Sequence, residues 1–171
     1  MTPEVWNHTL IYGGFLSLAL FLFIVGSSIY NRELWLNDYP PDIRQKYGRP
    51  SAQTIRQQKW FGVAMLVIMI LVLLADGLTL PRMASGDPAF LLIFRSTFIV
   101  YLMGRLMDFL VIDLLLGAVI RPWFRVLPGT EGAAGYRNVN YHFNAFLRSV
   151  LSGAVLCLLL SAVVLVINTL V

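Results

Sequence analysis

The stretch GRLMDFLVID at residues 104–113 carries three charged side chains that could do chemistry in a chain that is 58% hydrophobic. Arg105 and Asp108 are three residues apart, so on a helix they share a face and can form an ion pair. Asp113 lies five residues beyond Asp108, and an α-helix turns it well away from that pair. Such groups inside a membrane can bind a charged ligand or line a path for protons, ions or solutes. The alternative is that Arg105 and Asp108 form a neutral ion pair that only fixes the register of the helices.

The segment that holds these residues is too charged to be a clean membrane span. Residues 89–120 would be about 48 Å long as a helix, against roughly 30 Å of hydrocarbon in a bilayer. Each charge near the bilayer centre costs about 2.5–3.5 kcal/mol, so we expect the charges to face the interior of a helical bundle. Every 20-residue window of this segment contains at least three of Arg95, Arg105, Asp108 and Asp113.

The composition indicates an integral membrane protein. Only 13% of the 171 residues are charged, against about 25% in soluble domains. Three further runs are apolar around their whole circumference and reach the length of about 20 residues that a membrane helix needs. We therefore predict one all-α membrane domain over residues 1–171, a bundle of four transmembrane helices at about residues 10–30, 60–80, 89–120 and 144–170.

The basic residues predict the orientation of this bundle. The connection at residues 31–59 holds six Lys or Arg residues and that at 121–143 holds three, whereas the turn at 81–88 has one and the N-terminal tail has none. The positive-inside rule then places both connections in the cytoplasm and both termini outside. The net charge of +4 is explained by this topology, so we expect the lipid bilayer and not nucleic acid as the partner.

The connection at residues 31–59 has local signals of its own. Residues 42–47 could form a short helix that Gly48 ends, and Ser51 could cap a helix that runs into the span at 60–80. Trp35 and the neighbouring tyrosines favour a position at the membrane surface. We interpret this connection as a solvated linker with interfacial anchors, with a lipid-binding element as the alternative.

The connection at residues 121–143 adds groups that can handle protons beside the charged span. Glu131 and His142 are acid–base side chains, with a flexible turn that anchors the last span as the alternative interpretation. A metal site needs at least three convergent ligands, and a b-type haem usually takes paired histidines within the spans. The spacing supports neither, so we expect no metal and no cofactor. The candidate polar site is the set Arg105, Asp108, Asp113, Glu131 and His142.

A second pair of charges is predicted to have a structural role. Asp76 lies near the far end of the span at 60–80, and a hairpin with the next span brings it close to the level of Arg95. We expect an Asp76–Arg95 ion pair that fixes the two helices against each other. His8 lies near the outer face, away from the candidate polar site. Cys157 is the only cysteine, which excludes a disulfide within one chain.

Three stretches carry a resemblance to a known group of proteins. They are NDYPPDIRQKYG at 37–48, DFLVIDLLLG at 108–117 and PGTEGAAGYRNVNYHF at 128–143. Together they resemble a family of small, uncharacterised bacterial four-span integral membrane proteins. The resemblance implies a bacterial inner (cytoplasmic) membrane setting, and it transfers no activity and no residue role.

Three classes of function remain open for such a chain. The first is passage of a proton, an ion or a small solute along Arg105, Asp108 and Asp113, which we favour at this point. A four-helix protomer is thin for such a path, so this class implies a homo-oligomer. The second is a membrane enzyme that acts on a lipid or amphiphile at the cytoplasmic face. The third is a structural or accessory subunit.

Overall fold

The computed structural model describes residues 1–80 and 90–170, and the regular structure in these ranges is helical throughout. The prediction of an all-α fold is therefore confirmed. In chain order, the elements are α1 (Pro3–Tyr30), the 3₁₀ helix η1 (Arg32–Asp38), α2 (Pro41–Tyr47), α3 (Ala52–Thr79), α4 (Phe90–Met107), the π-helix η3 (Asp108–Ile120), the 3₁₀ helices η4 (Trp123–Arg125) and η5 (Ala134–Arg137), and α5 (Val139–Leu170).

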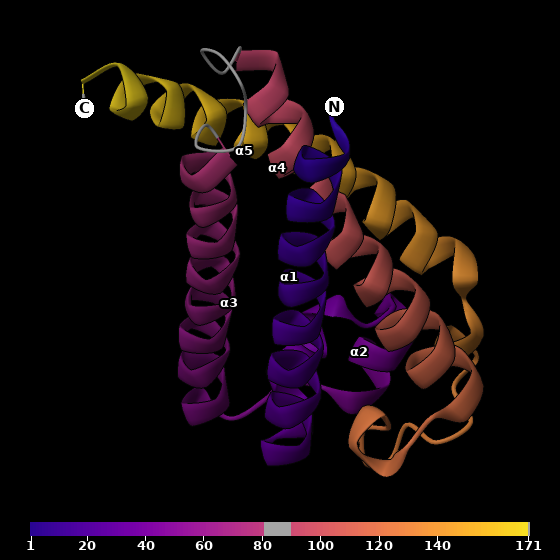
Figure 1. The fold of residues 1–171 in the computed structure, drawn as a ribbon. Helices are drawn as coiled ribbons and strands as arrows, with labels where there is room; N and C mark the ends of the chain where they lie inside the picture. The colour runs from indigo at the N-terminus through magenta and orange to yellow at the C-terminus, as the bar shows by residue number, and fades with distance from the viewer. Residues whose placement is uncertain (81–89, 171) are drawn as a thin grey trace.

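Three helices are long and apolar enough to cross a membrane, namely α1, α3 and α5, with 28, 28 and 32 residues (Figure 1). The more charged α4 has 18 residues and continues directly into η3. Both termini lie at one end of the bundle, and the regions that join α1 to α3 and η3 to α5 lie at the other (Figure 1). Below, these are the terminus end and the loop end.

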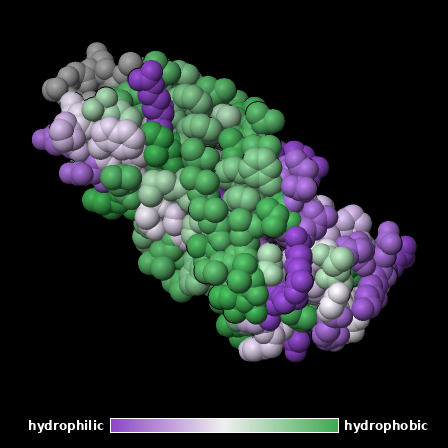
Figure 2. Space-filling view, turned by 90° about the vertical axis from the view of Figure 1, so that its right-hand side faces the viewer, coloured by the Kyte–Doolittle hydropathy of each residue, from purple (hydrophilic) through white to green (hydrophobic). Residues whose placement is uncertain are grey.

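The surface has the polarity expected of a membrane protein. Figure 2 shows a broad band of hydrophobic residues between hydrophilic residues at the two ends, and the larger hydrophilic region is at the loop end. Many large apolar side chains of the long helices are exposed, such as Leu22 of α1 at 60% and Leu71 of α3 at 61%. Exposed apolar area on this scale requires a lipid environment or partner protein to cover it.

The long helices begin at side chains that suit helix starts. The hydroxyl of Thr2 accepts a hydrogen bond from the backbone N–H of Val5 at the start of α1, where Pro3 occupies the first turn. At the start of α3, the hydroxyl of Ser51 accepts a hydrogen bond from the backbone N–H of Thr54 at 3.1 Å. Helix α3 then continues through the predicted span without a break. The predicted capping role of Ser51 is confirmed. The short α2 ends at Gly48, whose φ of +90° suits glycine.

The centre of the bundle is α4, which contacts α1, α3 and α5. Close approach depends on glycines: Gly104 of α4 lies against Leu16 and Leu20 of α1, and Gly153 of α5 lies under the Tyr101 ring of α4. Small residues allow such crossings in membrane bundles. The buried residues of this region form the central core, which consists of Leu16, Leu20, Val72, Leu73, Val100, Tyr101, Cys157 and Leu160.

The two connecting regions pack together at the loop end, which the sequence did not predict. Ile43 and Leu127 are fully buried in a shared apolar cluster. The Tyr39 hydroxyl donates to the Arg125 carbonyl at 3.0 Å. The interpretation of residues 31–59 as a solvated linker is therefore wrong, because apolar side chains of this region are buried in a core shared with residues 121–143. We call these packed elements, η1, α2, η4 and η5, the loop layer.

One close contact in the loop layer gives a testable prediction. The backbone N–H of Gly135 donates to Asp42 Oδ2 at 2.8 Å, and a Cβ at Gly135 would collide with the same carboxylate. Gly135→Ala should lower the free energy of unfolding by about 1–3 kcal/mol, the usual cost of overpacking. The thermal unfolding midpoint in detergent micelles measures this change. Ala134→Ser, at the exposed neighbouring position, serves as the control, and equal midpoints for the two variants would contradict the prediction.

Candidate functional site

A polar cavity of about 500 Å³ lies at the loop end of the bundle, between the helices and the loop layer. Residues of α1, η1, α3, α4, η3, η4 and α5 line it, so residues from distant parts of the chain meet there. Three aspartates and three arginines balance each other in charge. The charged or titratable side chains of the lining that bear on its chemistry are Asp38, Arg105, Asp108, Asp113, Arg125, His142 and Arg148.

The ion pair expected between Arg105 and Asp108 forms at the junction of α4 and η3. Arg105 Nη1 lies 2.6 Å from Asp108 Oδ2, and Arg105 Nε donates to the Ser149 hydroxyl of α5 at 3.0 Å. Both side chains are largely shielded, with 22% and 14% of their surface exposed. A charge-assisted bond this short, with a third partner on another helix, holds α4 and α5 in a fixed relation.

Asp113 also faces the cavity, contrary to its predicted direction. An α-helix turns by roughly 140° over five residues, which would point Asp113 away from Asp108. Residues Asp108–Ile120 instead form a π-helix, in which hydrogen bonds join residues five apart, as from the N–H of Arg121 to the Leu116 carbonyl at 3.0 Å. Residues five apart therefore come near one face, and both aspartates line the same cavity.

Asp113 is shared loosely between two basic side chains. His142 Nδ1 lies 3.5 Å and Arg125 Nη2 lies 3.7 Å from Asp113 Oδ1. Both distances exceed those of a good hydrogen bond. The Arg125 guanidinium also lies over the Tyr39 ring, 5.4 Å from its centre, and its buried Nε has no hydrogen-bond partner among the described residues. The cavity therefore contains cationic groups whose bonding capacity is only partly used.

The sequence analysis missed several residues of this site. Asp38 comes from η1, and nothing in its local sequence points to the cavity. Arg125 of η4 could be expected from the sequence only as one of several groups able to reach Asp113, beside Arg121 and other loop groups. Arg148 lies in the apolar run of α5, where the cost of a charge was a signal that could have identified it. The Asp38 residue retains exposed surface, and desolvation by neighbouring protein atoms raises its pKa. The Asp113 charge raises this pKa further, and Arg125 opposes the shift.

Glu131 does not belong to the site. Its side chain is exposed in the turn before η5, and its carboxylate accepts a hydrogen bond from the N–H of Gly129 in the same turn at 3.2 Å. It is not part of the cavity lining. The structure thus gathers Arg105, Asp108, Asp113 and His142 of the predicted set and leaves Glu131 in solvent, because the turn at 128–132 faces outward.

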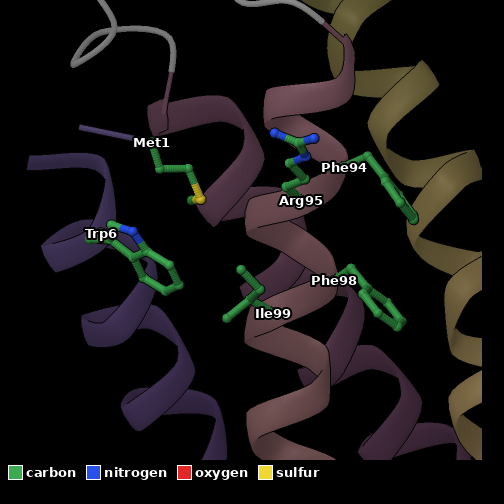
Figure 3. Close-up of a pocket in the computed structure, with 6 residues that line it drawn as sticks. All are labelled: Met1, Trp6, Phe94, Arg95, Phe98 and Ile99. Carbon is green, nitrogen blue, oxygen red and sulfur yellow. The ribbon is translucent and has the colours of Figure 1, made fainter. Parts of the chain in front are cut away.

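The expected Asp76–Arg95 ion pair is absent from the described residues. Asp76 is fully buried and accepts a hydrogen bond from Ser96, while Arg95 is exposed. Neighbouring residues on a helix point about 100° apart, so Ser96 rather than Arg95 turns toward Asp76. Arg95 borders a shallow apolar groove between α1 and α4, beside Trp6 and Ile99 (Figure 3).

Within residues 1–80 and 90–170, no three His, Cys, Asp or Glu side chains lie close enough together to bind a metal ion. The cavity instead offers three kinds of group: paired charges, a histidine beside an aspartate, and underused arginines. Such a set can bind a charged ligand or move a proton to or from it. Comparison of the chain with protein-family models, with curated proteins and with solved structures finds no match.

Proposed function

We propose that this protein binds the phosphate-bearing headgroup of a lipid or similar amphiphile in the polar cavity at its loop end. In this proposal, α4 and η3 form a fourth membrane-spanning segment beside α1, α3 and α5. The basic residues of the two connecting regions favour a cytoplasmic loop end and external termini. The cavity then opens at the cytoplasmic face of a bacterial inner membrane. The observation that carries the proposal is that two of the three cavity arginines, Arg125 and Arg148, have no anionic partner within hydrogen-bond distance in the described residues.

An anion fits the cavity better than a cation does. Arg148 forms no salt bridge with any residue of the described ranges, and the Arg125 Nε is buried and unbonded. Arginine matches the oxygens of phosphate through its planar set of donors. The long distances from Asp113 to His142 and Arg125 leave donors that a phosphate oxygen could engage. Asp38 lies on the same lining and suits a cationic group of a zwitterionic headgroup.

An apolar wall beside these charges favours an amphiphile over a free ion. Ile24, Trp35, Met65 and Met69 line the same cavity. The helices α3 and α5 meet near the terminus end, where Gly77 lies against Val164, and they spread apart toward the loop end (Figure 1). An acyl or isoprenoid chain would leave the cavity sideways between these two helices, while its headgroup stays with the arginines.

Transport of a proton, an ion or a solute through one protomer is less well supported than binding of an amphiphile. The central core lies between the cavity and the terminus end, and Leu16, Leu73 and Val100 in it are fully buried. A proton, ion or solute would need a polar route through these packed side chains. An oligomer that supplies a route between protomers would restore that possibility. A purely structural role would leave the buried arginine donor unexplained, because such groups are costly when unsatisfied.

Acid–base catalysis on the bound amphiphile is a second candidate, favoured by one observation. His142 presents Nδ1 to Asp113, and its side chain is 9% exposed beside the cavity. A carboxylate that orients one imidazole nitrogen leaves the other free to take or give a proton. In this interpretation, His142 is the general base or acid and the arginines hold the phosphate.

The binding proposal is tested with the protein in detergent and three probes: short-chain phosphatidylglycerol, inorganic phosphate, and an alkyl glucoside of similar chain length. Phosphatidylglycerol should bind, and Arg148→Gln should weaken its affinity at least about tenfold, because a hydrogen bond to a charged group contributes about 1.5–3 kcal/mol. Arg137→Gln, at an exposed position outside the cavity lining, is the matched control. Equal affinities in the two variants would overturn the proposal. If inorganic phosphate binds as tightly as phosphatidylglycerol, the ligand is the free phosphate ion and not a lipid.

The binding should also depend on pH through Asp38. Burial raises the pKa of Asp38, so its carboxyl takes up a proton at a higher pH than an ordinary aspartate does. Each protonated Asp38 removes a negative charge from the lining, and phosphatidylglycerol should therefore bind more tightly as pH falls from 7.5 to 4.5. Binding isotherms at both pH values measure the change. Asp38→Asn should reduce it, and an undiminished pH dependence in that variant would exclude Asp38 as its source.

A further inference from the structure

A second polar network is buried at the terminus end, remote from the cavity. Asp76 of α3 is fully buried, and its Oδ1 accepts a hydrogen bond from Ser96 of α4 at 3.0 Å. The Ser96 hydroxyl shares a hydrogen bond of 2.8 Å with Thr9 of α1. His8 of α1, 6% exposed, places Nε2 3.3 Å from Asp76 Oδ1 and 3.2 Å from the Asp76 carbonyl. Three helices thus meet around one carboxyl group.

The charge on this network must be balanced within it. An isolated carboxylate is very costly in a low-dielectric interior. No arginine or lysine of the described ranges forms a salt bridge with Asp76, and His8 is its partner. A pair made of neutral His8 and ionised Asp76 would leave a net charge buried, and a doubly protonated pair would leave the opposite charge. Only the pair that holds one exchangeable proton is neutral.

The carboxyl group also has an unused atom. Asp76 Oδ2 is buried and finds no hydrogen-bond partner in residues 1–80 and 90–170. A carboxylate with one bonded and one bare oxygen is a poor structural staple, because the bare oxygen carries the cost of lost hydration. It is a suitable place for a proton, which removes the charge from that oxygen. The geometry therefore favours a proton-binding role over a fixed ion pair.

A groove connects this pair with the surface. It encloses about 580 Å³ and is lined by Glu4, Asn7, His8, Ile11, Tyr12 and Thr79. The Thr79 hydroxyl lies 3.4 Å from His8 Nε2 and 3.2 Å from the Tyr12 hydroxyl. His8 thus lies between the groove and Asp76, where it can pass a proton in either direction.

The other titratable or charged groups near the pair are few in the described structure. On α1 they are Glu4 and Tyr12, both on the groove lining. On α4, Arg95 is exposed and borders a different groove (Figure 3). The parts of α5 beside this region contribute Val164 and Ser161, which do not titrate, and the buried thiol of Cys157, which lies within range of the Asp76 charge. Among the described residues, a proton taken up by the pair is therefore balanced by the pair itself.

We propose that His8 and Asp76, held in place by Ser96 and Thr9, form a proton-binding site that exchanges with solution at the terminus end through this groove. The proposal does not depend on the ligand of the polar cavity. Proton binding breaks no covalent bond of the chain: one proton moves from solution to the His8–Asp76 pair and returns. If the termini lie outside, the site responds to the external pH.

The sign of the pH dependence follows from proton counting. In an unfolded chain, aspartate loses its proton near pH 4 and histidine near pH 6.5, as rough values. Between these two pH values, the His8–Asp76 pair holds one proton in the folded protein and also one proton in the unfolded chain. Above about pH 6.5, the folded pair still holds a proton that the unfolded pair has lost, so stability falls as pH rises. Because one proton is involved, the unfolding equilibrium constant can increase by at most about tenfold for each unit of pH.

The test compares the thermal unfolding of the full chain and of Asp76→Asn in nanodiscs of neutral lipid between pH 6 and pH 9. The wild-type protein should lose stability relative to Asp76→Asn as pH rises, because the amide needs no proton. Glu4→Gln, which changes only the groove rim, should keep the wild-type pH dependence. A constant difference between wild type and Asp76→Asn over this range would overturn the proposal.

Two further arms cover the remaining outcomes. If Asp76→Asn does not fold, Asp76→Ser makes the same comparison, since it also removes the carboxyl group and retains a polar side chain. The measurements are repeated with sodium chloride replaced by choline chloride. If sodium restores wild-type stability at pH 9 but does not stabilise the variant, the carboxylate binds a metal cation instead, and the proton proposal fails.

Discussion

Arg105→Gln is expected to lower the free energy of unfolding by about 3–5 kcal/mol, the range found when one partner of a buried ion pair is removed. The loss comes mainly from Asp108, which would be left shielded from water without the 2.6 Å contact with the guanidinium. Ser149 would lose the hydrogen bond from Arg105 Nε as well. The contact that joins α4 to α5 at the cavity would thus disappear. Denaturant or thermal unfolding in detergent micelles measures the change.

A double-mutant cycle separates this effect from the loss of side-chain packing. Asp108→Asn alone should also destabilise, and Arg105→Gln/Asp108→Asn should recover much of the loss, because two neutral amides leave no unpaired charge. Arg56→Gln, on the exposed first turns of α3, should change stability little. Additive losses in the double variant would contradict the idea that the two charges stabilise each other.

Gly153→Ala should destabilise the bundle by at least about 1–3 kcal/mol, the usual cost of an overpacked core. A Cβ at this position would collide with the Tyr101 ring. The ring cannot swing aside freely, because Tyr101 is 4% exposed and its hydroxyl donates to the Ser149 carbonyl at 2.7 Å. Helices α4 and α5 would have to separate, which would also stretch the contact between Arg105 and Ser149. The thermal unfolding midpoint should fall accordingly.

A second glycine provides the control with the opposite sign. Gly14 of α1 has open space around it, and Gly→Ala within a helix normally stabilises by about 0.5–1 kcal/mol. Gly14→Ala should therefore raise the unfolding midpoint or leave it unchanged. If Gly153→Ala behaved in the same way, close packing of Tyr101 on Gly153 could not be part of the fold.

The sequence was sufficient to predict the helical class and the long apolar helices, because runs of about 20 apolar residues have few alternatives to a membrane helix. It underestimated how far the helices extend. The run at 10–30 belongs to α1, which begins at Pro3, and the run at 60–80 belongs to α3, which begins at Ala52. Polar residues at these ends lie outside the apolar band, where hydropathy gives no signal. The caps at Thr2 and Ser51 set the true starts.

The candidate site was partly predictable, and the errors have physical causes. Arg105 and Asp108 were found because their spacing suits any helix that pairs residues three apart. The direction of Asp113 was wrong because the α-helical period does not hold in η3. Asp38 and Arg125 belong to the loop layer, whose packing depends on contacts between distant segments. Periodicity reports only the local backbone, so it cannot reveal such contacts.

The partner of Asp76 was missed for a related reason. The hairpin argument compared only the two neighbouring spans, so it offered Arg95 as the nearest basic residue. The structure inserts α1 beside both helices, and His8 is the base that reaches the carboxyl group. A bundle of helices brings together segments that are far apart in the chain, and the order of spans alone does not say which ones touch.

The packing of the loop layer has a consequence for the order in which the protein forms during synthesis. Asp42 and Tyr39 bond to residues 125–141, about ninety positions later in the chain. Until the ribosome has made those residues, Leu36 and Ile43 lack Leu127 and Tyr136, the buried members of their cluster that come later in the chain. The early helices are therefore inserted first, and the cavity acquires its base only near the end of translation, when the last helix emerges.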